Sequence, residues 1–204
     1  MKKNYIRVLA LLLCALFGLG LLSCSGDKVE SAEPMDMQSL SLQELSKYAT
    51  LGQYTGIKIK SGIQSKDEAV WGVVKNRATI NEYPEQQVNY YLSQLEAQYK
   101  YYADEAGVSY EEMLAEVGAT EESMKKDAQN MAIDDVIYEL VRRAENITLS
   151  AEEKQNLFDK YAEKYVADYG YNKDYVKQNL AELIYESMLY DKTTEYLITN
   201  NIFE

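Results

Sequence analysis

The sequence predicts a mainly α-helical protein that follows a short apolar segment at the N-terminus. Three observations predict this fold class. Apolar residues recur at spacings of three and four from residue 84 to the end of the chain. Capping residues and glycines interrupt that pattern at short intervals, where helices should begin and end. Only two prolines occur in 204 residues, and only Pro84 lies in this region.

The first 23 residues have the pattern of an export signal. Lys2, Lys3 and Arg7 precede an apolar run over residues 8–22. That run is too short for a bilayer core, which needs about 20 residues, but it suits a signal peptide. Its end, Leu-Leu-Ser-Cys, resembles the lipobox of bacterial lipoproteins. We expect residues 1–23 to be removed and Cys24 to carry a membrane-anchoring lipid such as palmitate, although a plain signal peptide or an uncleaved membrane helix would share the apolar run.

The amino-acid composition argues against several classes of function, including metal sites, thiol catalysis and nucleic-acid binding. The only other cysteine is Cys14, so the processed chain would have no thiol free for a disulfide, a metal or catalysis. Histidine is absent, which removes the commonest general base and metal ligand. The net charge is −12, and it falls to about −15 without the signal, so the chain should repel nucleic acids and anionic headgroups. We expect no enzymatic activity, no cofactor and no metal.

Between the anchor and the helices, the sequence predicts two segments. Residues 24–45 are polar with little periodicity and predict a flexible tether. Residues 46–82 predict a short strand around Tyr54, Ile57 and Ile59, followed by a helix that opens with a capping box of Ser65 and Glu68. Trp71, the single tryptophan, is expected to anchor a small core.

From residue 83 to 204 the sequence predicts one domain of five helices. Pro84 opens the first, which ends at Gly107; Ser109 and Glu112 cap a short second helix that ends at Gly118. Thr120 opens a long third, Ser150 and Glu153 a fourth that ends at Gly170, and Asn172 the last. The expected core faces of the third and fifth helices are Met124, Ala128, Met131, Ile133, Ile137, Leu140, Val141 and Ala144, and Val176, Leu180, Leu183, Ile184, Met188 and Leu197.

These residues resemble the C-terminal, SurA-like chaperone domain of trigger factor. The similar segments are EYPEQQVNYYLSQL, GVSYEEMLAEVGATEESMKKDAQNMA, IYELVRRAENITLSAEEKQNLFDKYAEKY and ESMLYDKTTEYLITNN, which together span roughly residues 83–201. The order and spacing of these segments carry the resemblance. Where anchored relatives have an isomerase domain of the FKBP type, this chain passes directly from NRATIN to EYPEQQ. The resemblance therefore implies helical arms that hold unfolded chains, without isomerase activity and without a ribosome.

Tyrosine is the residue that should make such contacts. The chain has 19 tyrosines and three phenylalanines, and a tyrosine ring offers a large contact area with few rotors to order. Each ring could equally well pack against a neighbouring helix. The residues expected to bind unfolded clients are Tyr90, Tyr91, Tyr99, Tyr101, Tyr102, Met113, Tyr165 and Tyr169.

Three patterns in the sequence resemble enzyme or metal sites. Ser123 and Lys126 match an S-x-x-K motif, but its partner motifs are missing. The glutamate pairs 111–112, 121–122 and 152–153 lie where helices begin, and they suit the helix dipole. Asp168, Asn172 and Asp174 crowd one turn without forming an EF-hand loop. We interpret all three patterns as structural.

The sequence thus predicts a lipid-anchored chaperone on the extracytoplasmic face of the cell membrane, which holds unfolded or newly exported polypeptides. One alternative is an adaptor that docks a single folded partner of a secretion or cell-wall complex. A second is an accessory subunit of an enzyme whose catalytic domain is a separate chain.

Overall fold

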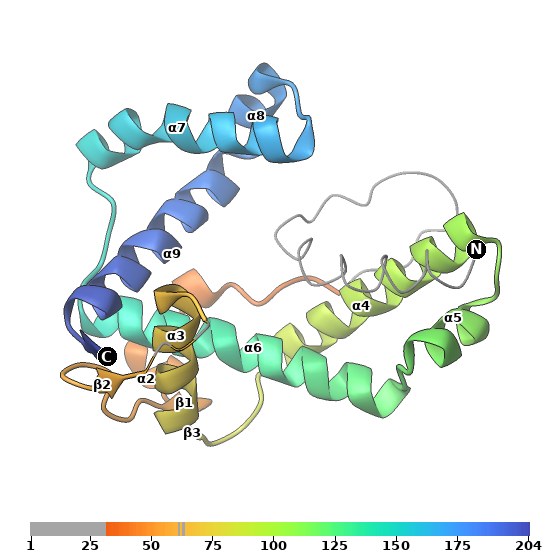
Figure 1. Ribbon diagram of the computed structural model, residues 1–204, viewed down its shortest axis with the longest axis horizontal. Helices are drawn as coiled ribbons and strands as arrows, with labels where there is room; N and C mark the ends of the chain where they lie inside the picture. Colours follow the sequence, from red (N-terminus) through yellow and green to blue (C-terminus); the bar gives the residue numbers. More distant parts are fainter. Residues whose placement is uncertain (1–31, 61, 63) are drawn as a thin grey trace. The chain divides into compact units, whose positions relative to one another are not determined.

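The computed structural model describes residues 32–60, 62 and 64–204. It is mainly helical, as the sequence predicts, with α2 to α9 joined by short connections and two pairs of very short strands (Figure 1). The expected signal peptide and Cys24 lie outside the described residues. Within the described residues, no helix is both long enough and apolar enough to cross a membrane.

The described chain divides into two compact units. The insert unit comprises residues 32–35 and 84–132, and the main unit comprises residues 36–83 and 133–204. The division falls inside the long helix α6 (Glu121–Ala144). The sequence predicted a single domain over residues 83–204, but these residues belong to both units. Residues 133–204 form one unit together with residues 46–82, which were predicted to be a separate segment.

The insert unit is built on a helical hairpin of α4 (Glu85–Ala106) and α5 (Tyr110–Val117). Pro84 is the N-cap of α4, and Gly107 ends the helix in the left-handed conformation, with φ of 64°. Ser109 and Glu112 form the expected capping box of α5: the Glu112 amide donates to Ser109 Oγ at 3.2 Å and the Ser109 amide to Glu112 Oε2 at 2.9 Å. Val88, Leu95, Met113 and Met124 are buried in this unit.

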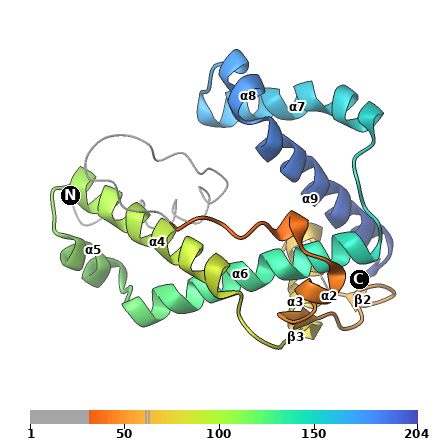
Figure 2. The same ribbon diagram turned by 180° about the vertical axis from the view of Figure 1, so that it is seen from behind.

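The main unit begins earlier in the chain than the sequence predicts. A 3-10 turn η2 (Met37–Ser39) and the helix α2 (Leu42–Leu45) fold within the segment predicted to be a flexible tether, so that prediction is wrong for residues 36–45. One cause is local, the capping box of Ser41 and Glu44; the others are tertiary, since Met37 and Leu45 are buried and Arg143 binds the backbone of this segment. We call residues 36–45 the strap (Figure 2).

Two short strand pairs connect segments that are distant in the sequence. β1 (Ala49–Thr50) pairs antiparallel with β3 (Thr79–Ile80). β2 (Lys58–Ile59) pairs in parallel with β4 (Ile202–Phe203), with Lys58 opposite Ile202. The predicted strand around residues 54–59 is thus confirmed only at Lys58–Ile59, and α3 (Lys66–Arg77) follows with the expected capping box of Ser65 and Glu68.

The last predicted helix is in fact two helices. α7 (Ala151–Tyr169) is followed by α8 (Lys173–Asn179) and α9 (Ala181–Thr199), and the backbone leaves the helical conformation at Leu180, with φ of −116°. Ion pairs hold α8 against α7: Lys173 Nζ lies 2.9 Å from Glu163 and Lys177 Nζ 2.6 Å from Asp159. Because α8 packs on α7, it cannot continue the line of α9.

The core of the main unit includes the single tryptophan, as predicted. Trp71 of α3 is buried, its Nε1 donates to Thr194 Oγ1 of α9 at 2.8 Å, and its ring stacks on Tyr190 at 5.7 Å between centroids. Most of the predicted core face of α6 is buried, but Ala144 is exposed and Met131 is only half-buried. Ala144 is the last residue of α6.

Candidate functional site

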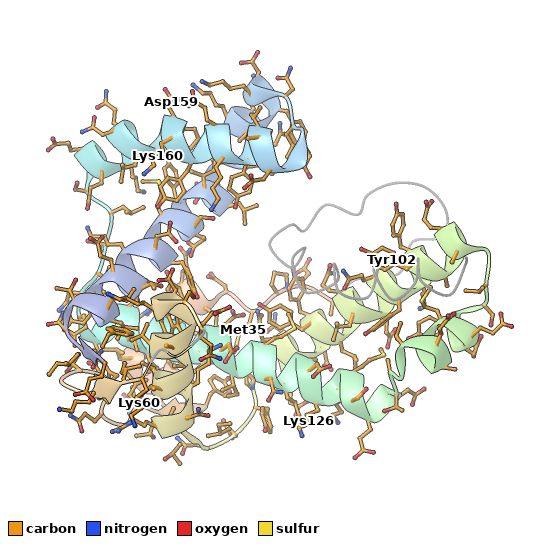
Figure 3. All side chains as sticks on the ribbon, in the orientation of Figure 1. Met35, Lys60, Tyr102, Lys126, Asp159 and Lys160 are labelled. Carbon is orange, nitrogen blue, oxygen red and sulfur yellow. The ribbon has the colours of Figure 1, made fainter. Side chains whose placement is uncertain are left out.

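The tyrosines of α4 form the first candidate surface. Tyr101 is 44% exposed, and Tyr90, Tyr91, Tyr99 and Tyr102 are half-buried. The rings of Tyr101 and Tyr102 meet edge to face, with centroids 5.5 Å apart, and those of Tyr90 and Tyr91 are tilted at 5.3 Å. Figure 3 labels Tyr102 on this helix. Pairs of rings on neighbouring residues leave accessible aromatic area on α4.

The side chains where α5 meets the first turns of α6 are more enclosed. Met113 is 2% exposed and Met124 is also buried, while the Tyr110 hydroxyl donates to Met124 Sδ at 3.8 Å. Burial, and then the nearby carboxylates led by Glu96, raise the pKa of Tyr110. The prediction of Met113 as a client-binding residue is therefore wrong in this structure, because its side chain fills the core of the hairpin.

The second candidate surface is an open groove of about 430 Å³ where α7 meets α9. Its floor is aromatic: the rings of Phe158 and Tyr185 lie 5.5 Å apart and tilted by 55°. Lys154 Nζ lies 4.6 Å from the centre of the Tyr185 ring, in a cation–π contact. Leu157, beside Phe158, is among the exposed apolar side chains of the chain. The residues that line the groove are Ala151, Lys154, Gln155, Phe158, Asp159 and Tyr185.

Bonds between α7 and α9 keep this groove in place. The Tyr161 hydroxyl donates to Asp191 Oδ2 at 2.6 Å, and burial together with this bond raises the pKa of Tyr161. Lys192 Nζ donates to Glu153 Oε1 at 2.5 Å and to the Thr148 carbonyl at 2.8 Å. The two helices are thus joined at several points along their crossing.

Tyr165 belongs to this junction and not to an exposed surface. It is 9% exposed, and its hydroxyl lies 2.9 Å from Ser187 Oγ. The prediction of Tyr165 as a client-binding residue is wrong in this structure, since the ring packs between α7 and α9. The side chain of Tyr169 and the whole of Cys24 lie outside what the structure describes.

Several residues of the enzyme-like and metal-like patterns have structural partners. Ser123 Oγ accepts from the Thr120 amide at 2.9 Å and donates to the Thr120 carbonyl, which places it at the start of α6. Glu112 and Glu153 accept from cap amides. Asn172 Oδ1 accepts from the Asp174 amide at 2.8 Å and so caps α8. Across residues 32–60, 62 and 64–204, no three acidic, cysteine or histidine side chains form a group that could hold a metal ion.

None of the six residues that line the groove was among the residues predicted from the sequence to bind clients. Lys154 and Phe158 are four residues apart, so they share one face of α7, and that spacing was readable. Tyr185 lies on another helix, and no sequence pattern showed which residues of α9 meet α7. The eight predicted residues lie on three helices: α4 and α5 in the insert unit, and α7 in the main unit.

The charges around the two surfaces differ. Residues 84–132 contain ten carboxylates and three lysines, whereas residues 150–199 contain ten carboxylates and six lysines.

Comparisons with family models, with curated proteins and with solved structures found no match to this chain. The resemblance to the chaperone domain of trigger factor stays a prediction from the sequence.

Proposed function

We propose that this protein is a lipid-anchored chaperone that holds unfolded polypeptides outside the cytoplasm, without isomerase activity. One observation carries the proposal: aromatic side chains remain accessible on two helical elements, in small areas bordered by charge. Tyr101 and Tyr102 form one such area on α4, and Phe158 with Tyr185 forms the other in the groove.

Small accessible aromatic areas suit transient holding. Burying apolar surface stabilises a complex by about 25 cal/mol per Å², so covering one or two rings gives only a weak contact. A chain that touches several such areas gains affinity from their number, and each contact can still be released separately. Weak, multiple contacts allow a client to leave and fold.

The position of the chain in the cell follows from the N-terminal sequence and is part of the proposal. The lipobox-like Leu-Leu-Ser-Cys would place a lipid on Cys24. The net charge of −12 argues against additional attraction to anionic headgroups, so the lipid would be the anchor. The clients would be newly exported polypeptides near the membrane.

An aggregation assay tests the proposal. The processed chain, residues 24–204, should suppress aggregation of several unrelated proteins, such as reduced insulin and heat-denatured malate dehydrogenase, at near-stoichiometric amounts. The same concentration of a folded, acidic control protein should not. If all clients aggregate as they do in buffer, a holding function is excluded. Tight binding of one folded partner, measured by co-purification, would instead support an adaptor.

A further inference from the structure

The strap is attached to the main unit largely through its backbone. The guanidinium of Arg143, on α6, donates from Nη1 to the Leu40 carbonyl and from Nη2 to the carbonyls of Met37 and Gln38, at 2.8 and 2.9 Å. One side chain thus holds three backbone carbonyls of the strap. Every residue has a backbone carbonyl, so another segment that forms the same turn as η2 could offer its carbonyls to Arg143.

Arg143 is held in position by contacts that do not involve the strap. Its Nε donates to Glu139 Oε2 at 2.9 Å. Glu139 is only 4% exposed. Its carboxylate also accepts two hydrogen bonds from Arg142, from Nε to Oε1 at 2.9 Å and from Nη2 to Oε2 at 2.7 Å. These charge-assisted bonds fix the guanidinium with its remaining donors directed at the strap. The receptor for the strap is therefore preorganised on α6.

Apolar anchors complete the attachment. Met37 and Leu45 are buried at the two ends of the strap, whereas Ser39, Gln43 and Leu42 are exposed between them. Gln38 Nε2 adds one exposed bond to Glu186 Oε1, at 2.5 Å. Buried apolar anchors and backbone bonds together thus hold this turn and short helix in place.

We propose that the surface beneath the strap is a polypeptide-binding site that the chain's own strap occupies in the free protein. Its second occupant is an unfolded client segment with a bulky apolar side chain that replaces Met37, and with backbone carbonyls that accept from Arg143. This inference rests on the proposed function. Because the strap competes for the site, the apparent affinity for clients equals the intrinsic affinity multiplied by the fraction of molecules in which the strap is released.

A spin label on the strap tests this exchange. Gln43 is exposed, so Gln43→Cys in the processed chain with Cys24→Ser gives a single thiol for a nitroxide. The probe client is reduced, carboxymethylated α-lactalbumin, which stays unfolded. The nitroxide spectrum should sharpen when the client binds. A client that binds while the nitroxide spectrum stays unchanged would overturn the proposal.

A strap variant gives the second measurement. Met37→Ser with Gln38→Ala removes one anchor and the bond to Glu186 without changing the receptor on α6, and it should bind the client about fivefold more tightly. Leu42→Ser, on the exposed side of the strap, is the matched control and should bind like the unmodified chain. Equal affinity of all three chains, with a mobile strap in the first variant, would contradict the proposal.

A synthetic peptide of residues 35–46 separates this inference from the function it rests on. The Met37→Ser, Gln38→Ala chain should bind the peptide, and Arg143→Lys in that background should weaken binding because lysine lacks the fork of donors. If the peptide binds but no unfolded protein does, the site exists and the holding function fails. If the peptide does not bind, the site itself is excluded.

Discussion

The α4–α5 hairpin and the α7–α9 helices differ in whether their ion pairs and ring contacts lie within one helix or join two helices. In the hairpin, Lys100 pairs with Glu96 of its own helix at 3.7 Å. In α7–α9, ion pairs join different helices, as in Lys177 with Asp159 and Lys192 with Glu153. Ring–ring contacts follow the same division: Tyr101 meets its neighbour Tyr102, whereas Phe158 of α7 meets Tyr185 of α9. One cation–π contact does join the two helices of the hairpin, since Lys100 Nζ lies 5.6 Å from the centre of the Tyr110 ring.

This difference predicts whether a substitution in each region can change client binding without changing the stability of the fold. A ring that contacts its sequence neighbour adds little to the joining of two helices, so it can be removed while the helices stay packed. A ring that bridges two helices contributes to a surface and to the fold at once. The exposed tyrosines of α4 are therefore the better place to change binding alone, and the groove residues are not.

The largest expected effect comes from a matched pair of buried methionines. Met113→Ala in α5 and Met188→Ala in α9 should each lower the free energy of unfolding of their own unit by about 2–5 kcal/mol, because each leaves a cavity. Trp71 is the only tryptophan and lies in the main unit, so its fluorescence reports that unit alone. Met188→Ala should shift the fluorescence transition, whereas Met113→Ala should shift only part of the transition seen by circular dichroism. Coincident shifts of both probes in both variants would show that the units unfold together.

An intermediate effect is expected for client binding. Tyr101→Ser with Tyr102→Ser should weaken binding of unfolded α-lactalbumin by about threefold to tenfold, since one to two rings contribute about 1 kcal/mol of contact. Its melting temperature should stay close to that of the unmodified chain. Phe158→Ser should weaken binding and lower the melting temperature together. If the Tyr101, Tyr102 variant loses as much melting temperature as the Phe158 variant, the proposed difference between α4 and the α7–α9 groove is wrong.

The smallest effect concerns the ion pair of Glu153 with Lys192. The bond from Lys192, followed by the cap bonds from Ser150, lowers the pKa of Glu153 to about 2 from about 4.5. A carboxylate with a depressed folded-state pKa stabilises the fold above the unfolded value, and this contribution disappears as the pH falls towards 2. Glu153→Gln should therefore lower the melting temperature slightly at pH 7 and not at all near pH 2.

Lys192→Gln tests whether that small effect belongs to the pair. The double variant with Glu153→Gln should be less destabilised than the sum of the single variants, because both changes remove the same interaction. Strict additivity at pH 7 would assign the effect to the cap of α7 instead.

Local rules predicted the helices well because their signals lie within a few residues. The capping boxes at Ser65, Ser109 and Ser150 and the left-handed glycines at 107, 118 and 170 stand where the sequence placed them. Each capping box joins a side chain to a backbone group three residues away, and each glycine amide bonds to a carbonyl in the preceding turn, so no distant contact is needed to form them.

Long-range contacts account for what the sequence did not predict. The strap folds because Arg143 binds it from 103 residues away, at Leu40, and no periodicity marks such a contact. The break at Leu180 depends on α8 packing against α7. Of the proposed client-binding residues, Met113 and Tyr165 are buried because their partners come from elsewhere in the fold. The division into two units within α6 was likewise not readable from the helix pattern.

The order of the two units along the chain has a consequence for synthesis and export. Residues 84–132, nearly all of the insert unit, are contiguous, so they can fold as soon as they emerge. The main unit must wait, because β2 finds its parallel partner only at Ile202 and Phe203, and Trp71 finds Thr194 only late in the chain. A polypeptide truncated after residue 194 would contain the complete α4–α5 hairpin but would lack β4, so its main unit would stay incomplete and prone to aggregation.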